Sequence, residues 1–435
     1  MTFTGNTIPF KSEWVAAYQA THYKQPIFPV FAEQKFADML RQGASVIWSY
    51  DSDSDVQQLG ADGSYTSANK TVTDETLSVN QRPASTFRIP ATEKIQDHRP
   101  TQQKWAQKAM NRIFWWLDAK ILGDLQAGAA NSLSAGDFGG TAGKPITVST
   151  SLAAPIFAAA RRVLRNQNII YDENKKYSNV VKLDTISKYP VAAIPAELEE
   201  ALLLSIGFKS GDLGDDVIRQ GYINMLFGFN TFVSTALPFT VNYVVTAANA
   251  TNGDTFTVGG VTFTLATSDS AAGEITIGGS ASLTATAIAA ALNAPYTSSA
   301  TYTPLVRTSL TQAQAFIVDM ISATASDATV TIKVLGHGTV SVSDTAAADG
   351  FDTTTAAVHA IFGVSQSVAL VLQRYPNLEV SAGSILSNGS TGGYLAQDFV
   401  TWSLAGWKVF KTHTYQLVDV PILASSYSAP LNVYL

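Results

Sequence analysis

The sequence predicts a protein of the α+β class, and three observations lead to that prediction. Short segments with the two-residue periodicity of strands are interspersed with segments of helical periodicity. One helical segment, residues 102–127, is far longer than the rest. A further block, residues 241–355, is rich in Thr and alternates polar with apolar side chains over short stretches. We therefore expect separate sheets combined with helices.

The composition supports a folded chain of two or three domains. The 435 residues include 21 Phe, 16 Tyr and 7 Trp, which excludes intrinsic disorder as the main state. Because there is no cysteine, disulfides, a thiol nucleophile, zinc–thiolate sites and iron–sulfur clusters are excluded. The N-terminus lacks a secretory pattern, and no stretch supplies the ~20 continuous apolar residues of a membrane span. We expect a soluble protein of cytoplasmic origin.

The first two segments are predicted to be extended. Residues 1–43 combine apolar anchors with Pro26 and Pro29, which interrupt any long helix, so we expect an arm with short helices. Residues 44–92 are expected to form an extended two-stranded loop with a flexible tip. Strand character is found in residues 45–50, 72–79 and 85–89 of this loop.

Residues 93–150 contain the clearest helix, which is predicted over 102–127. Its apolar stripe, which we expect to pack against other elements, includes Trp105, Ile113, Trp116, Leu117 and Ile121. At about 1.5 Å per residue the helix is about 40 Å long, so we expect it to be a spine along the molecule. Trp105, Trp115 and Trp116 could instead form a ligand platform, but packing is the favoured interpretation because large aromatic side chains dominate cores and interfaces.

Residues 151–240 alternate between helix and strand. Helices are predicted over 153–167 and 196–204, with an apolar strand at 191–194 between them. A strand region punctuated by Gly follows. After Ala356 a further helix and more strands are predicted.

The block 241–355 has the features of an inserted domain. It holds eight acidic and two basic residues, so the whole net charge of −6 lies within it, and it has 23 Thr. Residues 255–258 and 261–265 alternate around Gly259-Gly260, a two-residue hairpin signal. A small helix is predicted over 283–292, and strands are predicted over 329–335 and 339–342.

Two loop motifs resemble ligand sites but lack required residues. Asp51, Asp53 and Asp55 have the spacing that opens a calcium loop, yet the sixth position lacks Gly and the twelfth lacks Glu. The segment GDFGGTAGKP resembles a phosphate loop, but it lacks the first Gly and the Ser or Thr that would bind magnesium. A solvated acidic tip and a flexible connector are the favoured interpretations.

No catalytic constellation can be assembled from the sequence. The five histidines show no spacing typical of metal ligands, and there is no GxSxG motif. The basic pairs Arg161-Arg162 and Lys175-Lys176 lack the surrounding pattern of a nucleic-acid-binding module. We therefore expect no enzymatic activity, no cofactor and no metal site.

A longer motif lies between Val191 and Pro238. An apolar strand ending in Pro precedes a helix, then an Asp-rich turn, an Arg, a Gly and a GF-x-x-[YF]-x-S-x-x-LP strand. This order resembles the central segment of tailed-phage major capsid proteins. The matching residues are Pro195, Asp215, Arg219, Gly221, Gly228, Phe229, Phe232, Ser234, Leu237 and Pro238. Gly permits tight turns and Pro closes a strand, so each has a structural role.

The resemblance implies the Hong Kong ninety-seven fold over about 320 of the 435 residues. It implies that residues 93–150 carry the spine helix and part of a peripheral domain. Residues 151–240 and 356–435 would form the axial domain, the latter segment also returning to the peripheral domain. The block 241–355 would be an accessory domain on the outer surface.

The function that the resemblance implies is self-assembly into pentamers and hexamers, which form an icosahedral head shell around double-stranded DNA. Separate scaffolding, portal and decoration proteins are the expected partners, and DNA would contact the inner face without sequence specificity. The virion shell, assembled in the host cytoplasm, is the expected location, with no membrane contact. Some relatives cross-link a loop Lys, but Lys70 is better interpreted as a solvated charge or an ion pair between subunits. An enzyme of mixed α and β structure, a decoration protein and a tail-tube subunit are the alternatives.

Overall fold

The computed structural model describes residues 26–33, 35–36, 40, 43–51, 58, 64, 70–90, 101–167, 189–207, 225–246, 251–336, 338, 340–345, 349–380, 384–387 and 393–424. These residues belong to two compact units. Unit 1 takes its described residues from 32–114 and 368–410, and unit 2 from 26–31, 115–367 and 411–424. Helices and several separate sheets are both present, so the predicted α+β class is confirmed.

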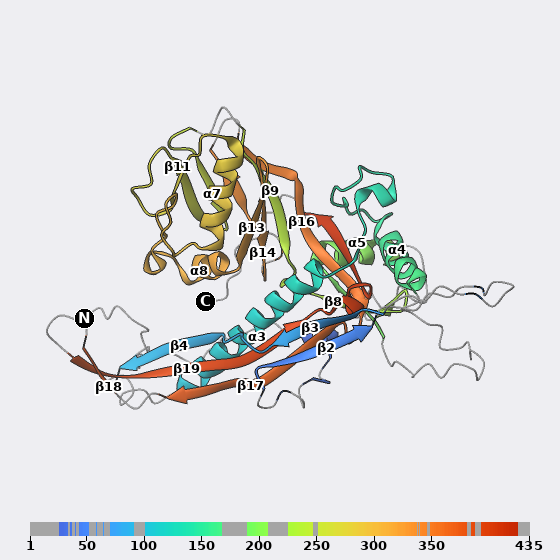
Figure 1. Ribbon diagram of the computed structural model, residues 1–435, viewed down its shortest axis with the longest axis horizontal. Coiled ribbons are helices and arrows are strands. Elements are labelled where there is room, and N and C mark those ends of the chain that lie inside the picture. The colour runs from blue at the N-terminus through green and yellow to red at the C-terminus, as the bar shows by residue number, and fades with distance from the viewer. Residues whose placement is uncertain are drawn as a thin grey trace. The chain divides into compact units, whose positions relative to one another are not determined.

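Unit 1 is built on a five-stranded sheet (Figure 1). Its two longest strands pair antiparallel along most of their length and are β17 (Val368–Val380) and β19 (Gly393–Lys408). The sheet is completed by β1 (Ala32–Glu33), β18 (Ser384–Ser387) and β4 (Ala84–Pro90). The strand predicted at 85–89 therefore forms as β4, but it pairs with β19 and not within a two-stranded loop.

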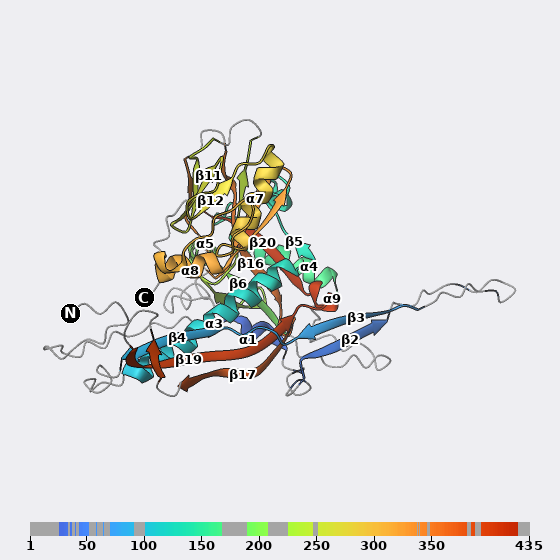
Figure 2. The same cartoon turned by 60° about the vertical axis from the view of Figure 1, so that its left-hand side comes forward.

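A two-stranded ribbon also belongs to unit 1 and confirms the strand pair predicted near residues 45 and 72. It joins β2 (Ser45–Asp51) to β3 (Val72–Ser78) in antiparallel register (Figure 2). On one face Trp48 packs against Phe36 and Phe410, with ring centroids 5.4 and 6.1 Å apart. The other face is exposed, because successive side chains of a strand point to opposite sides.

The predicted long helix forms as α3 (Thr101–Ala127), whose first half belongs to unit 1 and whose second half belongs to unit 2. Ile113, Leu117 and Ile121 are at most 2% exposed, as expected for an apolar stripe. Among the described residues, no helix has both the length and the apolar character needed to cross a membrane.

Unit 2 contains a nine-stranded sheet with the path β13-β14-β9-β16-β6-β8-β7, to which β20 and β5 are added. In that order the strands are Ile321–Ser326, Thr329–Val334, Phe239–Val244, Gly350–Val364, Pro190–Ile194, Phe229–Val233, Met225–Leu226, Leu417–Leu423 and Asn131–Ser132. The predicted helices form as α4 (Ala153–Asn166) and α5 (Ala196–Gly207). Both bury apolar faces in one core with this sheet.

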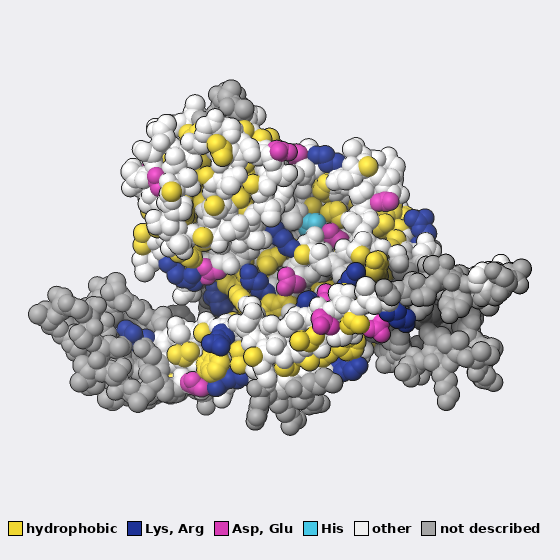
Figure 3. Space-filling model, viewed as in Figure 1, with side chains coloured by type: hydrophobic (Ala, Val, Ile, Leu, Met, Phe, Trp, Pro, Cys, Tyr) yellow, Lys and Arg dark blue, Asp and Glu magenta, His cyan; other side chains and the backbone are white. Residues whose placement is uncertain are grey.

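A four-stranded sheet in unit 2 lies within the predicted insertion. Its order is β12-β11-β10-β15, with bounds Glu274–Thr276, Val261–Ala266, Thr255–Val258 and Val342–Asp344. The predicted hairpin turn is present, since Gly259 and Gly260 have φ of +58° and +78°. The predicted small helix forms as α7 (Ala281–Asn293), and α8 (Gln312–Asp319) was not predicted. Figure 3 shows few charged side chains over this sheet and its helices.

The predicted bounds of the insertion, residues 241 and 355, do not coincide with the ends of strands. β9 crosses residue 241 and β16 crosses residue 355, and β13 and β14 extend the nine-stranded sheet beyond β9. Periodicity identifies a strand but not its neighbour in the sheet, so this pairing could not be predicted. The insertion with bounds 241–355 remains a prediction.

The prediction of a helix soon after Ala356 is wrong for the described residues. Strands β16 and β17 occupy this region, and the described helix there is the short α9 (Lys411–Thr414). Every described residue from Ala357 to Ser365 is buried. A strand buried on both faces is a continuous apolar run, which periodicity cannot distinguish from a buried helix. The strand predicted at 339–342 is displaced to β15.

Candidate functional site

The predicted motif between Val191 and Pro238 includes β6, β8 and β7, the strands at one end of the strand order of the nine-stranded sheet. β6 ends at Ile194, and the carbonyl of the next residue, Pro195, accepts N–H bonds from Leu198 and Glu199 at 3.2 and 3.3 Å. These bonds begin α5. Pro195 therefore lies where a buried strand gives way to a helix. Asp215, Arg219 and Gly221 lie outside the described residues.

The turn between β7 and β8 requires glycine. Phe227 and Gly228 have φ of +49° and +79°, in the left-handed region. The Arg161 guanidinium of α4 donates to the Phe227 carbonyl, and a Cβ at Gly228 would collide with the same guanidinium. Gly228 is thus required by its φ, whereas the Arg161 guanidinium ends a flexible side chain that can move away from an added Cβ.

Phe229 anchors β8 in the core of unit 2. It is fully buried, and its ring makes T-shaped contacts with Phe157 and Phe362 at centroid distances of 6.2 and 5.5 Å. Phe157 also contacts Phe362 at 4.9 Å, so the three rings form one cluster. Phe232, on the same strand, is only half-buried.

The end of the motif is linked through backbone hydrogen bonds to two strands, β6 and β16, and to a loop. Ser234 donates its N–H to the Ile194 carbonyl at 3.0 Å. The Leu237 carbonyl accepts the Gly338 N–H, and the Pro238 carbonyl accepts the His359 N–H at 2.9 Å. The described motif residues therefore connect strands and turns, and their role in assembly remains a prediction.

The tryptophans of α3 lie against other side chains. Trp105 meets Phe87 at 5.6 Å in an edge contact, and Trp115 stacks on Phe316 at 4.6 Å. The Lys120 ammonium lies 5.9 Å from the Trp116 ring centroid. These contacts support packing over a ligand platform.

A buried polar network in unit 2 was not predicted. His359 Nδ1 lies 2.8 Å from Asp419 Oδ1, and Gln126 donates to the other carboxylate oxygen at 3.1 Å. The side-chain oxygen of Gln126, Oε1, accepts a hydrogen bond from the Lys333 ammonium at 2.6 Å. Burial lowers the pKa of Lys333, while the nearby Asp124 and Asp419 oppose that shift. The four residues of this network come from α3, β14, β16 and β20, and no spacing in the sequence connects them.

Asp118 of α3 is a second buried carboxylate. It is 2% exposed and accepts the N–H groups of Ile27 and Phe28 at 2.8 and 2.7 Å, at the start of α1 (Phe28–Phe31). Burial raises the pKa of Asp118 to about 6, although both hydrogen bonds favour the ionised form. The cost of burying this charge therefore exceeds the gain from its two bonds.

Replacing Asp118 by Asn is expected to remove a pH dependence of stability. A folded-state pKa above the unfolded value means that protonation favours folding, so this stabilisation is present below about pH 4 and lost as pH rises through about 6. D118N keeps an acceptor oxygen and cannot ionise. The free energy of unfolding of D118N should exceed that of the wild type by up to about 3 kcal/mol near neutral pH, and this difference should disappear near pH 4. Urea unfolding at both pH values measures the difference, and a difference that does not change with pH contradicts this account.

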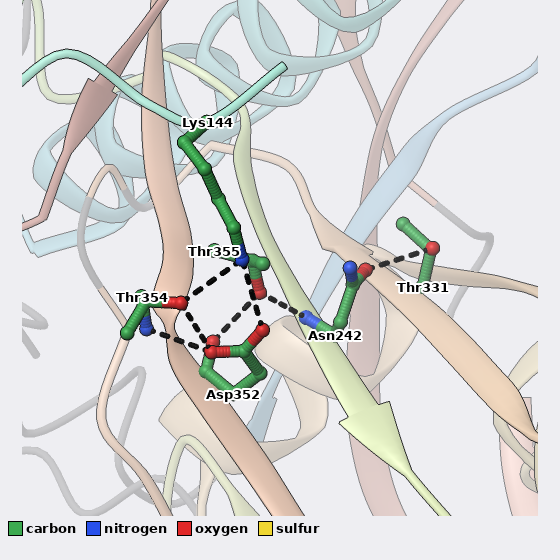
Figure 4. A network of polar contacts seen from close by, with 6 residues as sticks. All are labelled: Lys144, Asn242, Thr331, Asp352, Thr354 and Thr355. Carbon is green, nitrogen blue, oxygen red and sulfur yellow. Dashed lines mark hydrogen bonds and ion pairs between the residues drawn. The ribbon is translucent and has the colours of Figure 1, made fainter. Parts of the chain in front are cut away.

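Lys144, from the segment that resembles a phosphate loop, lies in a different kind of network (Figure 4). Its ammonium lies 3.3 Å from Asp352 Oδ2 and donates to Thr354 Oγ1 at 3.1 Å. The Thr355 hydroxyl donates to the Asp352 carbonyl, and it accepts the Asn242 N–H. These bonds stabilise an irregularity in the pairing of β16 with β9 between Asp352 and Ala357. Lys144 therefore has a structural partner.

The remaining motifs give no cluster for chemistry. Asp51 is exposed, while Asp53 and Asp55 lie outside the described residues, as do Lys175-Lys176. Lys70 is exposed, and its cross-linking remains untested. Within the described part of the chain, no group of three His, Asp or Glu is placed to hold a metal ion.

Comparison with solved structures identifies the fold. The chain is similar to a structure from Mycobacterium phage Che8, with a TM-score of 0.50 and 12% identity over 96% of this chain and 98% of that chain. It is also similar to the capsid structure of cyanophage P-SCSP1u, with a TM-score of 0.50 and 11% identity over 96% and 94%. The chain thus has a phage capsid fold, as the resemblance in the sequence implied. No protein-family model matches the sequence, and a search of curated proteins finds no match.

Proposed function

We propose that this chain is the major capsid protein of a tailed phage, and that it self-assembles through pentamers and hexamers into an icosahedral shell around double-stranded DNA. The observation that carries the proposal is the fold, which the chain shares with the cyanophage capsid structure over 96% of its length. The motif between Val191 and Pro238 supports the same proposal independently, because it was identified from the sequence.

The exposed face of the β2–β3 ribbon supports a function through assembly. Ile47 and Val72 are 61% and 63% exposed on the face opposite Trp48. A neighbouring subunit that covers this face would bury both side chains and favour association. Function in this proposal depends on the geometry of contacts between copies, and no reaction is needed.

The remaining partners and the location follow from the same proposal. The chain would reside in the virion shell, with DNA contacting its inner face without sequence specificity. Scaffolding, portal and decoration proteins would be separate chains. The Thr-rich block 241–355 would be an accessory domain on the outer surface.

Electron microscopy of the purified full-length protein tests the proposed function. Closed shells are expected. Tubes would instead favour a tail-tube subunit. A stable population of monomers under all assembly conditions would contradict a capsid function.

Replacing Ile47 by Asp is expected to reduce shell formation at least tenfold while unit 1 stays folded. An ionised carboxylate in a desolvated contact costs well over 1 kcal/mol per subunit, and every subunit of the shell carries the change. Leu283→Asp on α7 is the matched control, since Leu283 is also exposed, at 60%. Sedimentation separates shells from free subunits, and circular dichroism checks folding. Equal assembly of both variants and the wild type would contradict a buried ribbon face.

A further inference from the structure

The helices α4 and α5 of unit 2 carry exposed stripes of opposite charge. α4 contains three arginines and no acidic residue, whereas α5 contains three glutamates and no basic residue. Arg162 and Arg165 are exposed on α4, and Glu200 is exposed and Glu197 half-exposed on α5. None of these four side chains forms an ion pair with another described residue. Both stripes thus offer charge to a partner.

The two stripes match in spacing as well as in charge. On α5, Glu197, Glu200 and Leu204 are three and four residues apart, so they lie on one face. On α4, Arg165, Arg162 and Ala158 have the same spacing in the reverse direction. An antiparallel pair of helices would therefore place Glu197 opposite Arg165 and Glu200 opposite Arg162. Leu204 would then lie opposite Ala158.

The apolar end of this alignment also fits. Leu204 is 48% exposed, although Ala201 and Leu202 on the same helix are buried. Ala158 is exposed on α4 and leaves room for a large side chain. Tyr189 and Phe227 are also exposed, at the start of the parallel strands β6 and β8, whereas the exposed Val233 lies at the far end of β8. An exposed apolar area beside complementary charges is typical of a contact surface.

We infer that α5 of one subunit docks antiparallel on α4 of the next subunit. This inference rests on the proposed function and adds the residues of one contact between copies. Repeated from each subunit to the next, this contact uses a different stripe on each side, so it is heterologous and can close a ring. Such a contact has the symmetry that closed pentamers and hexamers require.

Charge reversal tests the contact. Arg162→Glu places acid opposite Glu200, and Glu200→Arg places base opposite Arg162. Each single variant should lower the fraction of assembled shells about fivefold or more. The double variant R162E/E200R restores opposite charges and should recover assembly. Recovery alone does not distinguish a contact between copies from one within a copy.

Mixing the two single variants makes that distinction. In a ring that alternates R162E and E200R copies, every α5 of one variant meets a compatible α4 of the other. Refolding the two together should therefore recover hexamers, whereas rings with an odd number of subunits retain one mismatched contact. Failure to recover any assembly in the mixture would overturn the inference, because charges that pair within one copy or bind DNA cannot be rescued by another chain.

An introduced disulfide gives a readout that does not depend on shell yield. The chain has no cysteine, so A158C and L204C copies carry one thiol each. Mixed and oxidised copies should give a dimer on non-reducing gels, with much less dimer from either variant alone. Absence of the mixed dimer in shells that assemble normally would reject this contact and leave the proposed function standing. Failure of the wild type to form shells would instead reject the proposed function.

Discussion

Replacing Phe229 by Ala is expected to destabilise unit 2 by about 3–5 kcal/mol, as other large-to-small changes at buried aromatic positions do. The Phe229 side chain is fully buried and touches Phe157 and Phe362. Removing its ring loses apolar burial and leaves a cavity between the sheet and α4. The surrounding rings cannot close that cavity fully, because they are fixed by their own strand and helix.

Urea unfolding, followed by the near-ultraviolet signal of the aromatic side chains, measures this loss. Phe232→Ala is the matched control, because it makes the same chemical change three residues away on β8 at a half-buried position. It should cost only about 1 kcal/mol. Similar losses in both variants would mean that the Phe229 cluster is not the packing centre that the structure indicates.

Elements defined by local chemistry could be predicted from the sequence. α3 and α4 follow from apolar stripes at helical spacing, and the β10–β11 hairpin follows from the two central glycines. Phe229 was recognised through the motif that contains it, together with Gly228. In each case the deciding interactions join residues close together in the chain.

Long-range pairing could not be predicted in the same way. β4 pairs with β19 across more than three hundred residues of sequence, and β14 pairs with β9, a strand that crosses the edge of the predicted inserted domain. β16 resembled a helix because burial on both faces removes the alternation that marks a strand. Periodicity describes one element and its faces, whereas sheet order depends on which edges meet.

The buried polar groups were missed for a related reason. His359, Asp419 and Lys333 each look like an isolated polar residue in an apolar segment. Their partners come from other elements, so the sequence offers no spacing to connect them. The interpretation of a lone His as a structural residue agrees with the buried position of His359, at 7% exposure.

Replacing Gly406 by Ala is the second change for which a large loss is expected, about 2–4 kcal/mol in unit 1. Gly406 lies on β19, where this strand passes close to Ser78, the last residue of β3, and to Val79, which follows it. A Cβ at this position would collide with the Ser78 carbonyl oxygen and lie 2.8 Å from the Val79 Cα. Both obstacles are backbone atoms, so no side chain can rotate away to relieve the contact.

In G406A the backbone at Val79 must therefore move away from β19. That movement would disturb the packing of Val79 and Leu77 in the core and the hydrogen bonds to β19. Val79 and Leu77 are 8% and 0% exposed in the core that also holds Phe410. Nearby, Gln81 and Ala405 exchange backbone hydrogen bonds at 2.9 and 3.0 Å, which hold this approach in place. Separating β19 from the end of the ribbon would weaken these contacts together.

Thermal unfolding and limited proteolysis of G406A should show earlier loss of unit 1 and faster cleavage near the ribbon. Gly279→Ala is the matched control, since a Cβ at Gly279 meets nothing within 4 Å and its φ is not in the left-handed region. That change should be neutral or slightly stabilising, because alanine restricts the unfolded chain. If G406A unfolds at the same temperature as G279A, the close approach of β19 to Ser78 and Val79 does not limit the residue at this position.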